Sequence, residues 1–391
     1  MNNITLINTR NLIFLLLAFT FPLSVPLSNI LAVLLAVLIL LEGSFSKKIQ
    51  KINSSKWMRS FFILWVMYII SFFVFYILNN ETFTDTFWLI KRISLLLLLP
   101  IFYSSSFSEK TIQKSVFSFL ISMFLSSVIA IAENYEIINL NPNWTISAFL
   151  KYTDHNVFLA FSLIISFYSL FSIKLENKYR DIILFFIPVY LFSLFTEGGK
   201  SGQLVFLFSV ILFLIFLFKK KWELLLLSLM SVFVFSSIVY NTSDIVKNRF
   251  NYEAKNILQN RKSSRNILLK ETIILIKKNP IFGYGTGSFT DEFGSVNEET
   301  QKVVSNQHKT PHNNYLYVWF ELGILGLIVF LSIFYFQIKE LIKKADGIFL
   351  ILFPIMFLII MFTDSYLFSQ NTLVLYLFLS VITINYQYKP S

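Results

Sequence analysis

Cysteine is absent from the 391 residues, and charged side chains are scarce. The lack of cysteine excludes disulfides, cysteine-ligated zinc, iron–sulfur clusters and thiol nucleophiles. Only 14% of the residues are charged and 55% are hydrophobic, whereas about a quarter of a soluble domain is charged. So little charge cannot cover a water-facing surface. The solid apolar blocks lack the alternation of a β-barrel, so we expect a polytopic α-helical membrane protein.

Features of some other classes are missing as well. We find no internal repeat of the kind seen in many secondary transporters, no low-complexity linker and no convincing cleavable signal peptide. The net charge of +11 is first explained by cytoplasmic loops, so it does not indicate nucleic acid as a partner. The sequence predicts one integral membrane domain over residues 1–391.

Long apolar runs predict an all-α fold with about twelve membrane-spanning helices. The expected spans are 11–26, 28–42, 61–78, 87–103, 115–132, 156–173, 182–196, 203–218, 224–240, 313–338, 347–363 and 370–386. Pro22, Pro26 and Asn29 interrupt the first two spans, which form either a hairpin of two short helices or one kinked helix.

The distribution of charge in the short loops predicts the orientation. Lysine and arginine gather in the loops 43–60, 104–114, 174–181, 219–223 and 339–346, and acidic residues mark the opposite loops 79–86, 133–155, 197–202 and 364–369. The positive-inside rule then places both termini in the cytoplasm. The long polar segment 241–312, between the ninth and tenth helices, becomes a periplasmic subdomain of a bacterial inner-membrane protein.

Within that segment, residues 265–278 have the pattern of an amphipathic helix. Its apolar positions are Ile267, Leu268, Ile274 and Leu275, with basic residues around them. Asn279-Pro280 should end the helix. We expect it to lie on the membrane surface, where most of its lysines would contact lipid headgroups.

Two of the three histidines, His308 and His312, close the segment. A neutral His312 at the water–lipid boundary could accept a proton from a hydroxyl near neutral pH, or could merely cap the next helix. Zinc binding by the pair is disfavoured, because Pro311 breaks the helix it needs and no third ligand is evident. We expect no metal and no other cofactor.

Arginines of the same segment suit a phosphate ligand. A guanidinium group binds phosphate oxygens bidentately, which favours a functional role for Arg265, with Arg261 and Arg249 as further substrate-binding candidates. Contact with anionic lipids is the alternative for this cluster. Lys91 and Arg92, near the outer end of the fourth span, could reach the headgroups or face a cavity.

Two glycine-rich stretches need separate interpretations. Gly283, Gly285 and Gly287 lack the strand context of a nucleotide-binding loop, so a turn with positive φ angles is the better interpretation. In the outward loop 197–202, glycines would let the backbone approach a ligand, and Lys200 could help to hold a diphosphate. A simple turn between helices is the alternative there.

Asp154 and His155 precede the sixth span on the outer side. They could position a polar substrate. Helix capping by Asp154 or Asn156 explains the same residues equally well.

Taken together, these motifs resemble the O-antigen ligase/polymerase superfamily. The resemblance is carried by a basic helix with Arg265, by Asn279-Pro280-x-x-Gly283-x-Gly285-x-Gly287-x-Phe289, and by His312-Asn313-x-x-Leu316 followed by Glu321-Leu322-Gly323-x-x-Gly326. It is strongest over residues 260–330. The turn at 154–156 and the loop at 198–202 sit where that family carries further short motifs.

The resemblance implies glycosyl transfer from an undecaprenyl diphosphate-linked glycan to an acceptor hydroxyl, without metal or nucleotide. The family's loop arginine falls on Arg265 and its histidine on His312, which would be the catalytic residues. Lys200 stands where the family often has arginine. The positive charge is kept, but the bidentate hydrogen bonding of a guanidinium group is lost. The remaining substrate-binding candidates are His308, Asn313, Arg261, Arg249, Asp154 and His155.

Within the family, we favour an O-antigen ligase, whose acceptor is a lipid A–core sugar. The alternatives are an O-antigen polymerase, which extends lipid-linked repeat units, and a protein O-oligosaccharyltransferase. From other classes, a flippase for lipid-linked glycans should show charges at mid-membrane depth. A metal-dependent glycosyltransferase would need Glu81 or Asp85 in a very short loop.

Overall fold

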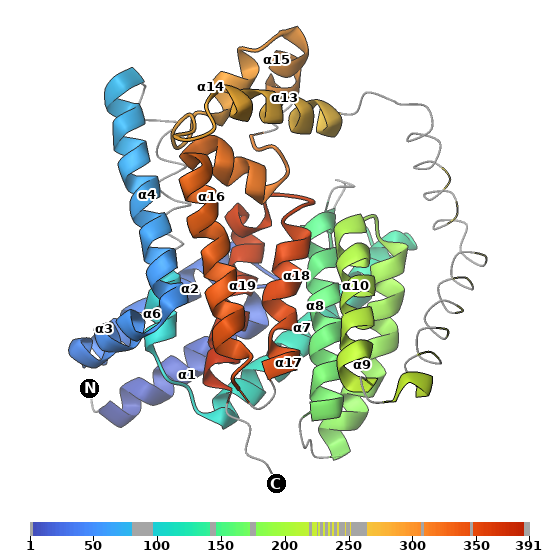
Figure 1. Ribbon diagram of the computed structural model, residues 1–391. Coiled ribbons are helices and arrows are strands. Elements are labelled where there is room, and N and C mark those ends of the chain that lie inside the picture. The colour runs from blue at the N-terminus through green and yellow to red at the C-terminus, as the bar shows by residue number, and fades with distance from the viewer. Residues whose placement is uncertain are drawn as a thin grey trace.

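The computed structural model describes residues 3–79, 97–140, 146–172, 177–218, 221–224, 264–305, 309–344 and 347–386, with isolated positions between 226 and 251. These residues form a helical protein (Figure 1). Two short strands, β1 (Ile146–Ser147) and β2 (Leu150–Lys151), pair in antiparallel register just before helix α8.

The first half of the chain contains α1 (Asn3–Thr20), α2 (Val25–Leu41), α3 (Phe45–Ser54), α4 (Lys56–Asn79), α6 (Leu98–Ser104), α7 (Glu109–Asn134), α8 (Tyr152–Ser172), α9 (Asn177–Thr196) and α10 (Lys200–Phe218). The second half contains α13 (Ser264–Lys278), α14 (Phe289–Gly294), α15 (Glu298–Ser305), α16 (Asn314–Leu341), α17 (Gly347–Leu350), α18 (Leu352–Ile360), the 3-10 helix η1 (Tyr366–Phe368) and α19 (Gln370–Asn385).

Six helices of the described chain are long and apolar enough to cross a bilayer, or up to seven if one bent pair counts as a single span. They are Lys56–Val74, Glu109–Asn134, Tyr152–Phe171, Asn177–Thr196, Lys200–Phe218 and Asn314–Leu341. The predicted membrane fold is confirmed, but the count of twelve spans is not. The expected spans 87–103 and 224–240 fall mostly outside the described ranges, and α1, α17–α18 and α19 are shorter apolar helices.

The first two predicted spans are separate helices. α1 ends at Thr20, and Ser24 caps α2 by accepting a hydrogen bond from the Leu27 amide. α2 then bends by 113° into α3, a helix within the predicted loop 43–60. Gly43 and Ser44, with φ angles of 69° and 54°, make this bend.

Helices α13, α14 and α15 lie across one end of the bundle (Figure 1). The predicted amphipathic helix is thus present, and it ends at Lys278, just before Asn279-Pro280. Leu268, Thr272 and Leu275 are buried, and the helix packs on α16. At least part of its inner face therefore contacts protein and not lipid.

The glycine-rich turn after α13 docks into a break in α16. Gly323 has φ 70° and ψ −172° in the middle of that helix, which frees backbone carbonyls from their helical partners. The Tyr284 and Gly285 amides bind the Phe320 and Glu321 carbonyls at 2.8 and 3.0 Å. A Cβ on Gly323 would lie 1.9 Å from a backbone oxygen, so only glycine fits.

The turn itself has the backbone predicted for it. Gly283, Gly285 and Gly287 have φ angles of 71°, 97° and 92°, a region that favours glycine. The Gly287 amide also donates to the Glu321 carboxylate at 2.9 Å. The two sequence motifs that flank the region 290–311 are therefore one structural unit.

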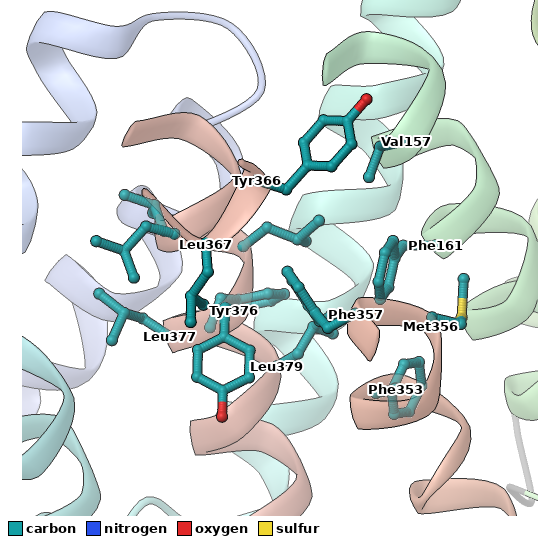
Figure 2. Close-up of a cluster of buried hydrophobic side chains, with 14 of the residues drawn as sticks. Val157, Phe161, Phe353, Met356, Phe357, Tyr366, Leu367, Tyr376, Leu377 and Leu379 are labelled. Carbon is teal, nitrogen blue, oxygen red and sulfur yellow. The ribbon is translucent and has the colours of Figure 1, made fainter. Parts of the chain in front are cut away.

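Aromatic side chains of α8, α18 and α19 pack together in the interior (Figure 2). Phe161 of α8 lies 4.9 Å from Phe357 of α18, ring centre to ring centre, and Phe357 meets Tyr376 of α19 edge-on at 4.9 Å. All three are buried. This packing holds α18, η1 and α19 in place, and with them the turn at 361–365 that joins α18 to η1.

Candidate active site

The turn 361–365 is fastened to the start of α16 by hydrogen bonds. The Asn314 amide donates to the Met361 carbonyl at 2.9 Å, and the Asn313 side chain donates to the Phe362 carbonyl at 3.3 Å. Asn313 also caps α16, because its side-chain oxygen accepts hydrogen bonds from the Tyr315 and Leu316 amides. The position of residue 312 relative to the turn is therefore fixed.

His312 lies directly before that cap. Its Nδ1 is 2.8 Å from Oδ1 of Asp364, and the two side chains are 26% and 24% exposed. Its φ angle of 51° is unusual for a residue other than glycine and turns the chain into the helix. The geometry gives a half-buried imidazole, oriented by a carboxylate, that a solute can reach.

Arg265 reaches the same turn from α13. Its Nη2 donates to the Thr363 carbonyl at 2.6 Å, and the guanidinium-bearing side chain is otherwise exposed. The hydroxyl oxygens of Thr363 and Ser201 lie 2.9 Å apart. Lys200, an exposed residue at the start of α10, directly precedes Ser201. Three distant segments of the chain thus meet at residues 363–364.

The carboxyl group of Asp364 is held in its charged form. Burial alone would raise its pKa, but the hydrogen bond and charge of His312 and a hydrogen bond from the Ser365 amide lower it. These outweigh burial, so the pKa lies below its usual value. A carboxylate that stays ionised can keep the imidazole in one orientation.

Asp154 approaches this region from the first turn of α8. It is buried, and its Oδ2 accepts a hydrogen bond of 3.1 Å from Asn371 at the start of α19. α8 already begins at Tyr152, so Asp154 lies inside the helix and is not its capping residue. It links α8 to the chain that follows the turn.

The neighbouring His155 points into the protein interior. Its Nε2 lies 2.9 Å from Ser126 and its Nδ1 lies 2.8 Å from Glu197, with no exposed surface on the imidazole. Ser193 donates to the same Glu197 carboxyl group at 2.5 Å. The expectation that His155 contacts substrate does not fit this geometry, because both ring nitrogens are engaged with protein in a sealed site.

Two glycines of the loop 197–202, Gly199 and Gly202, serve helix packing. A Cβ on Gly199 would lie 2.2 Å from Cβ of Asn156, and one on Gly202 would lie 2.2 Å from the Asn156 carbonyl oxygen. They let α10 approach α8 closely. The expected approach of this backbone to a ligand is therefore replaced by contact with a neighbouring helix.

Several candidate residues lie outside the described residues, namely His308, Arg249, Arg261, Lys91 and Arg92. Within the described ranges, no cluster of three or more histidine, aspartate or glutamate side chains could hold a metal ion. The candidate site consists of Arg265, His312 and Asp364, and Lys200 directly precedes Ser201, which contacts the same turn.

Asp364 and Thr363 belong to the candidate site but to none of the sequence motifs, and Ser201 belongs to the loop motif 197–202 without a role predicted for it. Asp364 is the acid of the predicted outward loop 364–369 and served only to assign topology. An acid in a short loop beside a membrane span is a weak signal for chemistry. Its neighbour in space, His312, is 52 positions away in the sequence.

Residues 182–331 match the family described as O-antigen ligase. This region contains Lys200, Arg265 and His312, and ends before Asp364. Among curated proteins, the O-antigen ligase of Salmonella typhimurium is 27% identical over 258 residues, which cover 62% of this chain and 60% of that protein. An uncharacterized protein of Haemophilus influenzae is 27% identical over 202 residues, covering 46% and 49%.

The chain thus spans between half and three-fifths of the length of these two relatives. The matched family region contains the basic helix, the glycine turn and the kink in α16. This part of the chain is therefore similar to the O-antigen ligase family, as its motifs indicated.

Proposed function

We propose that this protein is an O-antigen ligase. It would transfer a glycan from undecaprenyl diphosphate to a sugar hydroxyl of lipid A–core, on the periplasmic side of the inner membrane. The observation that supports this best is the position of the His312–Asp364 pair. It lies on the turn that Arg265 also binds, so a base and a phosphate-binding cation face one region.

His312 acts as the general base. With Nδ1 protonated towards Asp364, the lone pair of the imidazole is at Nε2, which takes the proton from the acceptor hydroxyl. Asp364 fixes this tautomer and stabilises the imidazolium ion that forms. The partial exposure of both side chains leaves room for a large glycan to approach.

Arg265 binds the diphosphate of the donor. A guanidinium group has five N–H donors, so a bond to the Thr363 carbonyl still allows a bidentate contact with phosphate. Lys200 supplies a second positive charge from the start of α10. The Lys200 ammonium group acts as a point charge, so it balances the charge of the diphosphate without requiring a particular hydrogen-bond geometry.

The reaction is a single displacement. The acceptor oxygen forms a bond to the anomeric carbon while its proton moves to His312. The bond between that carbon and the phosphate oxygen breaks, and its electron pair leaves on the diphosphate, whose charge Arg265 and Lys200 balance. Attack from the face opposite the leaving group inverts the anomeric configuration.

The test replaces the two central residues in the full-length protein. His312→Ala and Arg265→Ala should each abolish detectable glycan transfer in cells that lack the native gene. Lys270→Ala is the matched control, because it removes one exposed positive charge from the same helix. Full transfer by His312→Ala, or equal losses in the Arg265 and Lys270 variants, would refute the proposal.

The same deletion strain distinguishes an O-antigen ligase from an O-antigen polymerase. Loss of long chains from the core, with lipid-linked polymer retained, indicates a ligase. A single repeat unit on the core indicates a polymerase, which would use the same donor and the same two residues. Retention of lipid-linked glycan on the cytoplasmic face would indicate a flippase.

A further inference from the structure

A polar cavity of about 480 Å³ lies near α1 and α3, at the end of the molecule away from α13–α15. Its wall is formed by α1, by the bend between α2 and α3, and by the segment that follows α6. The polar residues at this wall are Arg10, Asn11, Glu42, Ser44, Lys48, Ser106 and Ser108. None of them belongs to the candidate active site, and the proposed transfer reaction does not use them.

Arg10 is the fixed part of this wall. Only 6% of the residue is exposed, and its Nη1 lies 2.7 Å from Oε1 of Glu42 and 2.9 Å from the Ser105 hydroxyl. Its Nη2 donates to the Ser106 carbonyl at 3.1 Å. The guanidinium group therefore fastens α1 to the α2–α3 bend and to the segment after α6, and its charge stays beside the cavity.

Lys48 of α3 lines the cavity and adds to this charge, and Lys51 of the same helix binds the segment after α6. The ammonium group of Lys48 binds the Ile39 carbonyl and lies 3.8 Å from Glu42, which Arg10 already engages. Lys51 donates to the Ser105 carbonyl at 2.8 Å and to the Ser106 hydroxyl at 3.3 Å. Glu42 is the carboxylate of the wall, so the cavity carries a net positive charge.

Positive charge together with hydroxyl groups suits an oxyanion. An ammonium group has three donors, and the Ser106 hydroxyl can donate its own hydrogen while it accepts one from Lys51. Phosphate offers several strong acceptor oxygens to such donors. The ligand class is therefore a phosphate ester.

Apolar side chains at and beside the cavity indicate where the phosphate comes from. Ile7 of α1 lines the cavity and is 42% exposed, and on the helices that form its wall Ile4, Phe45 and Ile49 are 75%, 56% and 56% exposed. α3 is a short helix with lysines and exposed apolar side chains, the composition of a helix at a membrane surface. Apolar chains beside a basic pocket match a phospholipid, whose headgroup and acyl chains are adjacent.

We propose that this cavity binds the phosphodiester headgroup of an anionic phospholipid. Lys48 and the serine hydroxyls hold the phosphate, while Arg10 and Glu42 keep the wall in shape. The acyl chains lie along Ile4, Ile7 and Phe45. The bound lipid thus stabilises the angle between α2 and α3.

The test measures thermal unfolding of the full-length protein in neutral detergent, with added phosphatidylglycerol or phosphatidylcholine. Phosphatidylglycerol should raise the unfolding temperature more than phosphatidylcholine does. Lys48→Gln should weaken the apparent affinity for phosphatidylglycerol by about fivefold. Lys47→Gln, which removes the same charge from an exposed neighbour on α3 outside the cavity wall, should leave it unchanged.

Three results would overturn the proposal. An equal loss of apparent affinity for phosphatidylglycerol in the Lys47 and Lys48 variants would show general attraction of the lipid to a basic surface. Equal stabilisation by inorganic phosphate would show a site for a soluble anion. No preference for phosphatidylglycerol would show that the residues form only a structural network. If Lys48→Gln does not fold, Ser44→Glu serves instead, because a carboxylate on the wall should repel the headgroup to a similar extent.

Discussion

Two histidine–carboxylate pairs in this protein have nearly the same local geometry and opposite surroundings. In each, Nδ1 of the imidazole lies 2.8 Å from a carboxylate oxygen. The His155 and Glu197 side chains are 0% and 2% exposed, whereas those of His312 and Asp364 are 26% and 24% exposed. The hydrogen bond alone therefore does not distinguish a reactive pair from a structural one.

The surroundings of the two rings differ. Nε2 of His155 meets the Ser126 hydroxyl at 2.9 Å inside the bundle, between α7 and α8. His312 instead stands at a turn to which Arg265 contributes a cation. Burial makes the first pair a fastening between helices α7, α8 and the end of α9, and exposure makes the second pair available to a substrate.

The largest expected effect comes from the exposed pair. Asp364→Asn should lower the rate of glycan transfer by about 10²–10⁴-fold, the usual contribution of a positioned base, because an amide at this position favours the wrong tautomer of His312. Transfer is measured in membranes with a purified lipid-linked donor. The unfolding temperature should change little, and a large fall in it would instead make this pair structural.

The buried pair should respond in the opposite way. His155→Ala leaves the Glu197 carboxyl group buried without its partner, which should cost about 3–5 kcal/mol of stability. The remaining folded protein should keep its specific activity. The double variant His155→Leu/Glu197→Leu should recover much of the stability, and thermal unfolding in detergent checks both. An inactive but fully stable His155→Ala would give this histidine a direct role in the reaction.

The smallest expected effect is a dependence on pH. The pKa of Asp364 is lowered in the folded protein, so the stability that this group contributes is present above its unfolded pKa of about 3.9 and is lost as the pH falls through its folded value. The difference in unfolding temperature between the native protein and Asp364→Asn should shrink as the pH falls below about 4. A difference that stays the same between about pH 5 and pH 2 would contradict a lowered pKa.

Much of the helical framework could be predicted from local sequence. The basic helix ends where Asn279-Pro280 requires it, and the three glycines of the following turn have the positive φ angles expected. Long apolar runs identify α7, α9, α10 and α16 because a bilayer selects length and hydrophobicity. Helix α3 was missed, because its polar and charged residues resemble those of a loop.

Function within the loop 197–202 was harder to predict. From the sequence, its glycines could let the backbone approach a ligand or could form a simple turn. In the structure, the close approach of Asn156 shows that Gly199 and Gly202 allow α10 to pack against α8. Sequence spacing contains no information on which helix will fill the space beside a glycine.

The sequence by itself determined the membrane class, the superfamily motifs and the two residues, Arg265 and His312, on which the proposed chemistry depends. Only the tertiary structure decided their partners. Asp364 lies 52 positions from His312, and Thr363 lies 98 positions from Arg265 and 162 from Ser201. The physical reason is that helix formation depends on neighbouring residues, whereas the orientation and exposure of a side chain depend on the elements packed around it.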